Sequence, residues 1–421
     1  MDRYDGSRIL VAGAGGFIGG HLVRELRRRG ASVRAVDIKP LAQWYQIDPA
    51  AENKVLDLRD RAAAYEAVAG TDYLFNLAAD MGGMGFIETH KADCMLSVLI
   101  NTHLLMAARH FRVRRVFFAS SACVYAAGKQ TEANVVPLQE SDAYPAMPED
   151  GYGWEKLFSE RMSRHFFEDF GVDCRIARYH NVYGPWGTYT GGREKAPAAI
   201  CRKVIEAQLS GSDTIEIWGD GEQTRSFMYI DDCIEGTLRI FEAEWREPIN
   251  LGSSELVTIN HLVDIVENIA NVKLRRIYKL DAPKGVRGRN SDNSTILREF
   301  GWEPSIKLED GLRSTYEWIF ADMNADLQPV RSPASFLLSS VDLTSSLRPW
   351  DRRILIENLG RAAGTSQLRS SASQTRRGGA RVARLTPRSL QRCPELMAAC
   401  KNDLRQSVGR AVVDKAMRLP C

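Results

Sequence analysis

Short apolar runs alternate with amphipathic stretches from residue 8 to about residue 180. The runs are typical of strands buried on both faces, and the stretches between them repeat apolar residues at the spacing of a helix. The predicted strands are residues 8–12, 31–37, 71–76, 115–120 and 174–178, and the predicted helices are 17–29, 91–110 and 152–170. This alternation predicts an α/β fold, a doubly wound parallel sheet with helices on both faces.

The pattern becomes more irregular beyond residue 185. Strand candidates at 214–218, 225–230 and 248–251 mix there with helix candidates near 231–243, 259–270 and 309–325. We therefore expect a smaller α/β lobe built from insertions after the later strands, with some elements returning to the first domain. The expected division is 1–184 for the first domain, 185–330 for the smaller lobe and 331–421 for a tail.

The tail differs from the rest of the chain in charge. Residues 331–421 hold 17 Lys and Arg against 6 Asp and Glu, a net charge of +11, and the whole chain carries +3, so residues 1–330 carry −8. The tail is rich in Ser and Arg and has little hydrophobic periodicity, which favours disorder. A basic arm that binds nucleic acid is one interpretation, but a solvated extension is favoured over it.

Composition excludes several classes of protein. With 44% hydrophobic and 26% charged residues, the chain matches an ordinary globular protein. No apolar run approaches the ~20 residues that span a bilayer, and the first residues lack the layout of a secretory signal. We therefore expect a cytoplasmic protein without a membrane partner. The eight cysteines include no CxxC pair and no Cys/His cluster at zinc spacing, so neither a disulfide scaffold nor a metal site is expected.

A glycine-rich turn lies between the first strand and the first helix. Gly13, Gly16 and Gly19 have the spacing GxxGxxG. Glycines in such a turn let a pyrophosphate approach the backbone, and the start of the helix, at Phe17 and Ile18, offers unpaired N–H groups. A purely structural turn is the alternative, because glycine also serves ordinary turns. The position between strand and helix favours a dinucleotide site in a Rossmann-type sheet.

An acidic residue at the end of the second strand indicates which dinucleotide binds. Asp37 lies 18 residues after Gly19, where a carboxylate accepts hydrogen bonds from a ribose diol and repels a 2′-phosphate. NAD is therefore predicted over NADP, although Lys39 softens the preference slightly. Asp57 and Leu58 follow a further strand candidate, which lies between the strands predicted at 31–37 and 71–76. They are expected to border the adenine.

Tyr152 and Lys156 lie four positions apart on a predicted helix, and hence on one face. A free tyrosine has a pKa of about 10, and a neighbouring ammonium stabilises its phenolate, so the pair is suited to proton transfer. Such pairs also occur by chance on protein surfaces. This pair gains weight from the dinucleotide turn and from Ser120 and Ser121, which end the preceding strand and offer a hydroxyl to a substrate.

These motifs together resemble the extended short-chain dehydrogenase/reductase family of nucleotide-sugar enzymes. Further stretches resemble the GDP-mannose 3,5-epimerases within that family. The stretches are Asn76–Phe86, Ser120–Tyr125, Gly191–Ala199, Trp218–Phe227 and Gly285–Asn293. The resemblance covers about residues 7–325. Its most specific parts are the Met-Gly-Gly-Met-Gly loop and the Gly-Gly-Arg-Glu-Lys segment.

The resemblance implies a homodimer with NAD bound mainly by 1–184 and a nucleotide sugar, GDP-mannose or its epimers, bound mainly by 185–330. Tyr152 takes the proton of the sugar 4-hydroxyl while the C4 hydride passes to NAD. The ketone so formed acidifies the hydrogens on C3 and C5, where Cys123 and Lys195 act as base and acid. The further residues implied to contact cofactor or substrate are Ala78, Ala79, Met81, Gly82, Gly83, Met84, Ser121, Asn181, Glu194, Arg225 and Arg287. Arg289 is a third candidate for clamping the diphosphate.

Two alternatives stay open. Another NAD-dependent 4-epimerase, dehydratase or decarboxylase of nucleotide sugars would not need Cys123 and Lys195, and the lack of an acidic pair after Ser121 counts against a dehydratase. A non-catalytic NAD-binding scaffold with a nucleic-acid-binding tail would have no reason to keep the tyrosine–lysine pair. One departure from the family is Ser97, where many members have an asparagine that supports this pair; Asn101 and water are the candidate replacements.

Overall fold

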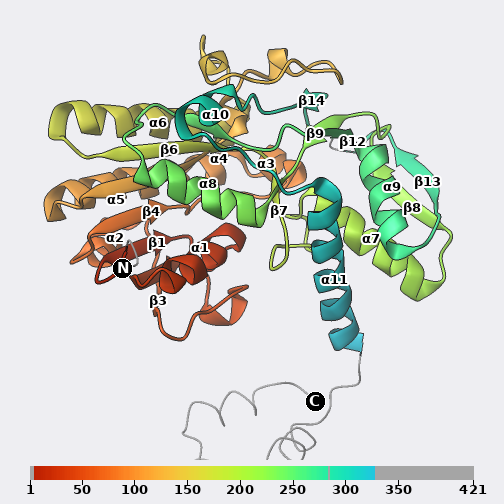
Figure 1. The fold of residues 1–421 in the computed structure, drawn as a ribbon, viewed down its shortest axis with the longest axis horizontal. Helices are drawn as coiled ribbons and strands as arrows, with labels where there is room; N and C mark the ends of the chain where they lie inside the picture. The colour runs from red at the N-terminus through yellow and green to blue at the C-terminus, as the bar shows by residue number, and fades with distance from the viewer. Residues whose placement is uncertain (1–3, 283–284, 328–421) are drawn as a thin grey trace, which may run out of the picture. The chain divides into compact units, whose positions relative to one another are not determined.

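The computed structural model describes residues 4–282 and 285–327 of the 421-residue chain. It is built on a seven-stranded parallel sheet in the order β11-β6-β5-β4-β1-β2-β3 (Figure 1). The strands are β1 Arg8–Ala12, β2 Ser32–Asp37, β3 Glu52–Val55, β4 Tyr73–Asn76, β5 Arg115–Ser121, β6 Cys174–Tyr179 and β11 Ile249–Leu251. The predicted doubly wound α/β fold is confirmed. The disorder predicted for 331–421 falls outside the described residues.

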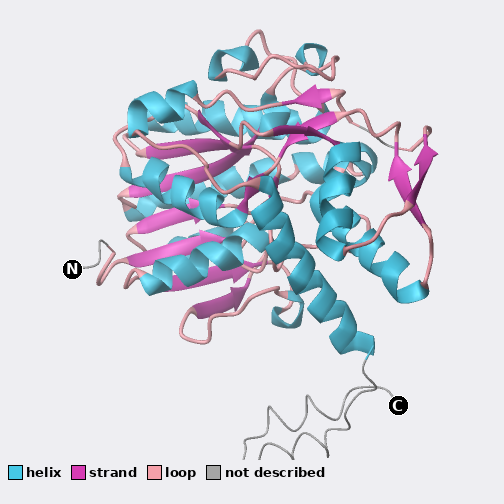
Figure 2. Ribbon diagram, turned by 45° about the vertical axis from the view of Figure 1, so that its right-hand side comes forward, coloured by secondary structure: helices cyan, strands magenta, loops and turns pink. Residues whose placement is uncertain are grey.

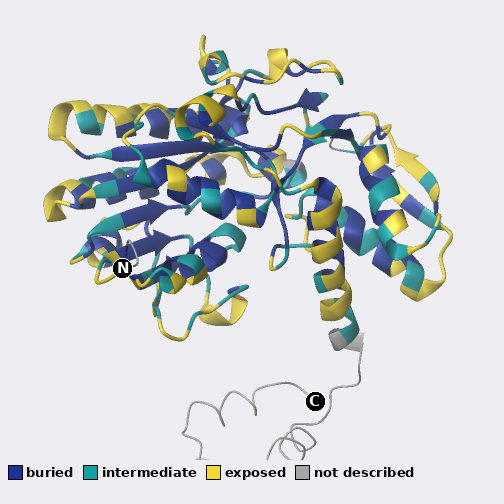
Figure 3. Cartoon of the chain, viewed as in Figure 1, coloured by how far each residue is buried: buried dark blue, intermediate teal, exposed yellow. Residues whose placement is uncertain are grey.

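Helices cover both faces of the sheet. Successive residues of a strand point to opposite faces, so each strand contributes side chains to two hydrophobic cores. In β1, Ile9 and Val11 belong to one hydrophobic cluster and Leu10 and Ala12 to another. The first cluster includes side chains of α1 (Phe17–Arg28) and α8 (Ile230–Glu242). The second includes side chains of α2 (Arg61–Val68), α5 (Ser97–Phe111) and α6 (Asp150–Phe170). Figure 2 shows the two helical layers, and Figure 3 shows that the strands between them are mostly buried.

A smaller lobe has a hydrophobic core of its own, to which three helices contribute. The helices are α7 (Ala196–Ser210), α9 (Ile259–Ala270) and α11 (Leu308–Leu327). Its strands are β8 Thr214–Trp218 paired with β13 Arg275–Lys279, and β9 Thr224–Ser226 between β12 Leu256–Thr258 and β14 Gly288–Arg289. The chain also returns to the large sheet from this region, through α8, β11 and α10 (Ser294–Phe300), which packs on β11.

Two predicted elements are divided in the structure. The helix expected over 91–110 is α4 (Lys91–Met95) followed by α5, because the turn tightens at Leu96, where ψ is −15°. The strand expected over 225–230 is β9 and then β10 (Met228–Tyr229), since β9 pairs within the lobe whereas β10 pairs with β7 (Val182–Tyr183). No helix in the described ranges is both long and apolar enough to span a membrane.

Candidate active site

The glycine-rich turn joins β1 to α1 at the carboxyl edge of the sheet. Gly13 has a φ of +83°, and its N–H donates to the Val36 carbonyl over 2.8 Å. α1 starts after Gly16, and no side chain caps its first turn, so its first N–H groups are available to an anion. A Cβ on Gly19 would lie 2.1 Å from the Gly13 carbonyl oxygen, so only glycine allows this close approach.

One side of this turn is covered by the segment that follows β2. Asp37 ends β2 and is 8% exposed, and its Oδ1 accepts the Lys39 N–H over 3.0 Å. Lys39 Nζ donates to the Gly15 carbonyl over 2.6 Å, and burial lowers the pKa of this lysine while Asp37 opposes the change. Trp44 packs beside Gly15 and donates Nε1 to the Lys39 carbonyl. The uncapped helix, the closely packed glycines and the carboxylate fit NAD.

The remaining predicted cofactor residues lie at neighbouring strand ends. The Ala78 N–H donates to Asn76 Oδ1 over 3.2 Å, and a Cβ on Gly13 would lie 2.9 Å from the Ala78 nitrogen. Leu58 is buried, whereas the pKa of Asp57 is held low by its hydrogen bonds with Arg59. Ala79 packs against a buried cluster that contains the candidate catalytic tyrosine and cysteine. These positions border the carboxyl ends of β1–β4, where parallel α/β sheets bind nucleotides.

Tyr152 and Lys156 lie one turn apart on α6 and are 5% and 2% exposed. Lys156 Nζ is 5.5 Å from the centroid of the Tyr152 ring. Burial raises the pKa of Tyr152 well above its usual value, the charges of Cys123 and Glu155 raise it further, and a hydrogen bond with Ser121 opposes the change. A phenolate at Tyr152 therefore requires positive charge close to it.

Glu155, to which no motif pointed, is a buried carboxylate in this pair's surroundings. Its side chain is 1% exposed, its Oε1 accepts the Ser159 hydroxyl over 3.0 Å, and its Oε2 lies 3.6 Å from Lys156 Nζ. Burial raises the pKa of Glu155, and the Lys156 ammonium opposes this. In the sequence, the only indication of a role for Glu155 is its position next to Lys156. The burial of its carboxylate follows from the packing of α6 and could not be predicted from that position.

Cys123 and Lys195 line the same cavity as Tyr152. Cys123 lies in a short helical turn after β5, its N–H donates to Ser121 Oγ over 3.2 Å, and its Sγ is 3.7 Å from Arg289 Nη1. Lys195 directly precedes α7 and reaches into the cavity, where burial lowers its pKa and Cys123 opposes the change. A phenol, a thiol and an amine therefore share one cavity.

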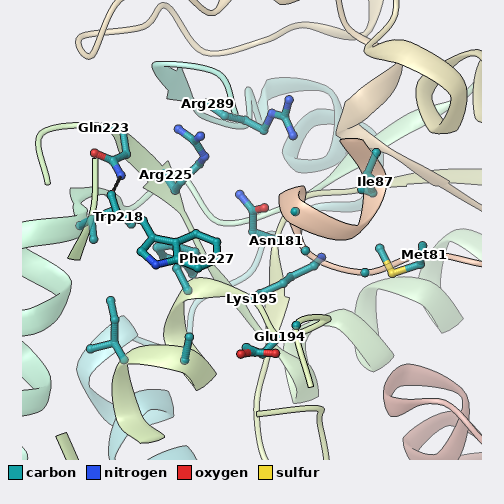
Figure 4. A pocket seen from close by; sticks show the side chains of 18 of the residues that line it. Met81, Ile87, Asn181, Glu194, Lys195, Trp218, Gln223, Arg225, Phe227 and Arg289 are labelled. Atoms are coloured by element: carbon teal, nitrogen blue, oxygen red, sulfur yellow. Dashed lines mark hydrogen bonds between the residues drawn. The ribbon is translucent and has the colours of Figure 1, made fainter. Parts of the chain in front are cut away.

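The cavity has a volume of about 260 Å³ and lies between the large sheet and the smaller lobe. It brings together most of the predicted substrate residues, namely Met81, Gly82, Gly83, Ser121, Cys123, Asn181, Glu194, Lys195 and Arg225. It also contains Arg289, the third candidate for clamping the diphosphate, and side chains that the sequence had not assigned, namely Ile87, Lys203, Trp218, Gln223 and Phe227. Figure 4 shows Lys195 between the rings of Trp218 and Phe227 on one side and Met81 on the other.

One predicted substrate residue, Arg287, lies outside this cavity. Arg287 pairs with Asp220 over 2.8 Å and has a side chain that is 37% exposed. Arg289 enters the cavity in its stead, held by Gln130 Oε1 at 2.7 Å from its Nε and by an ion pair with Glu149. Met84 begins α3 (Met84–Thr89), next to the glycines that line the cavity.

The polar residues of α5 that were considered as supports for Lys156 bind other partners. Ser97 Oγ accepts the Asp80 N–H over 3.0 Å, which ties the loop after β4 to α5. Asn101 accepts the Asn76 side-chain amide over 3.1 Å and donates to the Ser159 carbonyl on α6. These two residues therefore brace the segments on either side of the site.

A model of the NAD dependent epimerase/dehydratase family matches residues 9–252, and the chain belongs to this family of NAD-dependent enzymes. The predicted family and cofactor are thereby confirmed. Relatives at 48–49% identity match over 313 residues, or 74% of this chain. GDP-mannose 3,5-epimerase 1 of Oryza sativa subsp. japonica is 49% identical with 81% of its length covered, and GDP-mannose 3,5-epimerase of Arabidopsis thaliana is 48% identical with 82% covered. Among solved structures, the UDP-glucose 4-epimerase of Thermotoga maritima matches with a TM-score of 0.68 and 25% identity, covering 75% of this chain and 99% of that one.

Proposed function

We propose that this chain is a GDP-mannose 3,5-epimerase, which converts GDP-D-mannose to GDP-L-galactose and releases GDP-L-gulose as a C5-only side product. The observation that carries the proposal is a single cavity lined by Tyr152, Cys123 and Lys195. Inversion at C3 and C5 requires an acid and a base at those carbons, whereas epimerisation at C4 alone requires neither. The relatives of that name, at 49% and 48% identity, support the same assignment.

Tyr152 removes the proton of the sugar 4-hydroxyl. When bound, NAD would supply the hydride acceptor at C4 and the hydride that restores the alcohol, so the reaction would have no net redox change. The turn from Gly13 to Gly19 and the start of α1 would hold the pyrophosphate, and Asp37 the ribose diol. The Lys156 ammonium stabilises the phenolate of Tyr152, which burial alone disfavours.

Cys123 and Lys195 act on C3 and C5. A carbonyl at C4 acidifies both C–H bonds, because the carbanion left by proton removal is delocalised into it. Inversion then requires a base on one ring face and an acid on the other. The Arg289 guanidinium, 3.7 Å from the Cys123 sulfur, is the cation that a thiolate base requires. Burial lowers the pKa of Lys195, which makes its ammonium a better proton donor than that of an exposed lysine.

Two arginines are positioned for the diphosphate. β14 pairs with β9 in a register that sets Arg289 opposite Arg225, and both side chains line the cavity. Burial lowers the pKa of Arg225 to about 10, so the buried guanidinium favours an anionic partner. The rings of Trp218 and Phe227 offer apolar surfaces to the base of the nucleotide.

Product analysis in heavy water tests this proposal. Purified protein, GDP-mannose and no added reductant should give new epimers that carry deuterium at C3 and C5, as measured by NMR. Absence of exchange at both carbons would contradict the proposal. Epimerisation at C4 without that exchange would identify a different member of the family.

We also propose that the enzyme is a homodimer that pairs through α5 and α6. The two helices pack side by side, and Leu99, Trp154 and Phe158 are 37%, 45% and 55% exposed on them. Exposed apolar side chains on adjacent helices are typical of a subunit interface. Light scattering should give twice the chain mass for the wild type and the chain mass for Trp154→Glu. A monomeric wild type would reject the interface.

A cytoplasmic location and a division of labour between 1–184 and 185–330 are further proposals. The division is supported by α7, α9 and α11, which form the core of the smaller lobe. Cell fractionation with antibody detection tests the location. Nucleic acid is not expected as a partner, and gel-shift assays of the full chain at increasing salt test that expectation.

A further inference from the structure

The Arg193 side chain joins two loops that are far apart in sequence. Its Nη1 donates to Asp80 Oδ1 over 2.8 Å and to the Met81 carbonyl over 3.2 Å. Its guanidinium also lies over the Phe86 ring, 3.7 Å from the centroid, and that ring stacks on His90 at 4.2 Å. One side chain thus makes an ion pair, a second hydrogen bond and a cation–π contact with the segment that follows β4.

The same two loops also meet backbone to backbone. The Gly83 N–H donates to the Arg193 carbonyl over 3.0 Å. A Cβ on Gly83 would lie 2.6 Å from the Glu194 carbonyl oxygen, and one on Gly82 would lie 3.1 Å from Arg193 Cγ. Glycines at these positions therefore permit a contact that any side chain would separate.

Lys195 follows Arg193 by two residues and immediately precedes α7. On the other side of Arg193, Gly191 and Gly192 have φ values of +84° and +80°, and a Cβ on either would meet nothing within 4 Å. The chain before Arg193 is therefore loosely surrounded, whereas the chain after it enters a helix. Figure 4 shows Lys195 extending toward the segment that carries Met81 and Ile87.

We propose that Arg193 is a positioning residue, which locks the Gly-Gly-Arg-Glu-Lys segment onto Asp80 and Phe86 and so fixes Lys195 in the cavity. We call Arg193, Asp80 and Phe86 together the Arg193 latch. The inference rests on the proposed function for its catalytic consequence. The loop contact itself does not depend on any substrate.

The latch acts on local order more than on global stability. The side chains of Arg193 and Asp80 are 46% and 42% exposed, and exposed ion pairs contribute only about 0–1 kcal/mol to folding. Misplacing a proton-transfer group by about 1 Å, in contrast, can lower a rate about 100-fold. Loss of the latch is therefore expected to lower the rate of the chemical step while the fold remains.

The test compares Arg193→Gln, Asp80→Asn and the double variant in the full-length enzyme. Arg193→Gln should lower kcat for deuterium exchange at C3 and C5 about 10- to 100-fold, with a smaller change in KM. Formation of reduced nicotinamide on mixing with GDP-mannose, which depends on Tyr152, should persist within about threefold. The double variant should be no slower than Arg193→Gln, because both substitutions remove the same contact.

A control and a substrate-free measurement complete the design. Arg313→Gln removes an arginine that is also half-exposed, with a side chain 50% exposed and paired with Glu309 over 3.1 Å on α11; it should leave both rates unchanged. Hydrogen-exchange mass spectrometry of the protein without substrate should show at least tenfold faster exchange over 188–195 in Arg193→Gln, with α9 unchanged.

The outcomes separate the latch from the proposed function. If wild type gives no exchange with GDP-mannose, the proposed function fails, and the amide exchange of 188–195 alone decides whether the latch exists. If Arg193→Gln leaves that amide exchange and the C3/C5 rate within twofold of wild type, the latch is rejected. A parallel loss of both rates together with a fall of more than about 5 °C in Tm would show a structural role and also reject it.

Discussion

The cofactor side and the sugar side of this enzyme are built by different means. The turn that would hold the pyrophosphate is a continuous stretch, Gly13–Gly19, and it offers backbone groups whose access depends on the absence of Cβ atoms. The sugar cavity draws side chains from segments as distant as Met81 and Arg289. A contiguous site depends on local conformation, whereas an assembled site depends on how distant strands and loops meet.

The two sides also differ in charge. The cofactor side presents Asp37 beside an uncapped helix start, which suits a diol next to a pyrophosphate. The cavity presents Lys195, Lys203, Arg225 and Arg289, and burial lowers the pKa of the first three. These four cations outnumber the two carboxylates in the lining, Glu194 and Glu216, and in the proposed function they would attract the nucleotide diphosphate and supply proton donors around the sugar.

The largest effect is expected on the cofactor side, from Gly19→Val. Its Cβ would lie 2.1 Å from a backbone oxygen, so the turn must open, and overpacking of this kind costs about 1–3 kcal/mol or more. NAD content of the purified protein, measured by chromatography after denaturation, should fall at least tenfold, and all reaction steps should fail together. Gly128→Val is the control, because a Cβ there meets nothing within 4 Å. Full NAD content in Gly19→Val would contradict the assignment of the turn.

On the sugar side, Cys123→Ala should break one step only. Proton transfer by a positioned side chain is worth about 10²–10⁴-fold, so exchange at C3 and C5 should fall by that factor. NAD content and the absorbance of reduced nicotinamide on adding GDP-mannose should remain. If NAD content, nicotinamide reduction and exchange at C3 and C5 all fell equally, Cys123 would be needed on the cofactor side as well as on the sugar side.

A smaller effect distinguishes two neighbouring arginines. Arg289→Gln should lower kcat/KM about 10- to 100-fold, because it removes a buried charge-assisted contact worth about 1.5–3 kcal/mol. Arg287→Gln should change it less than about threefold, since its ion pair with Asp220 is exposed. Steady-state kinetics with GDP-mannose measure both variants. A larger loss of kcat/KM in Arg287→Gln than in Arg289→Gln would indicate that Arg287, and not Arg289, binds the substrate.

The smallest effect concerns His180, which lies where β6 leads into the smaller lobe and belongs to neither ligand region. Burial lowers its pKa to about 4, and its Nε2 lies 3.0 Å from Asn250 Oδ1. Between its usual value of 6.5 and 4, the unfolded chain binds a proton that the folded chain does not, so stability falls as pH falls. From pH 7.5 to 5 this amounts to about 2 kcal/mol.

Urea unfolding at both pH values measures this dependence. His180→Gln should lose about 2 kcal/mol less than the wild type over that interval, because the groups common to both proteins cancel. An identical loss of unfolding free energy in the two proteins would show that His180 does not cause the fall in stability at low pH.

Sequence patterns sufficed to predict the β1–turn–α1 unit, the carboxylate at the end of β2 and the tyrosine–lysine pair on α6. Each depends on residues within about 20 positions, so local conformation and helical periodicity place their side chains. The family resemblance pointed to Cys123 and Lys195, and the structure shows that both line one cavity.

The entry of Arg289 into the cavity, rather than Arg287, depends on contacts between distant segments. β14 contains Gly288 and Arg289 alone, and its pairing with β9 directs Arg289 toward Arg225 while Arg287 lies outside the strand. The Arg193 contact with Asp80 joins residues 113 positions apart. Such contacts follow from strand register and loop docking between distant segments, which no local pattern of residues specifies.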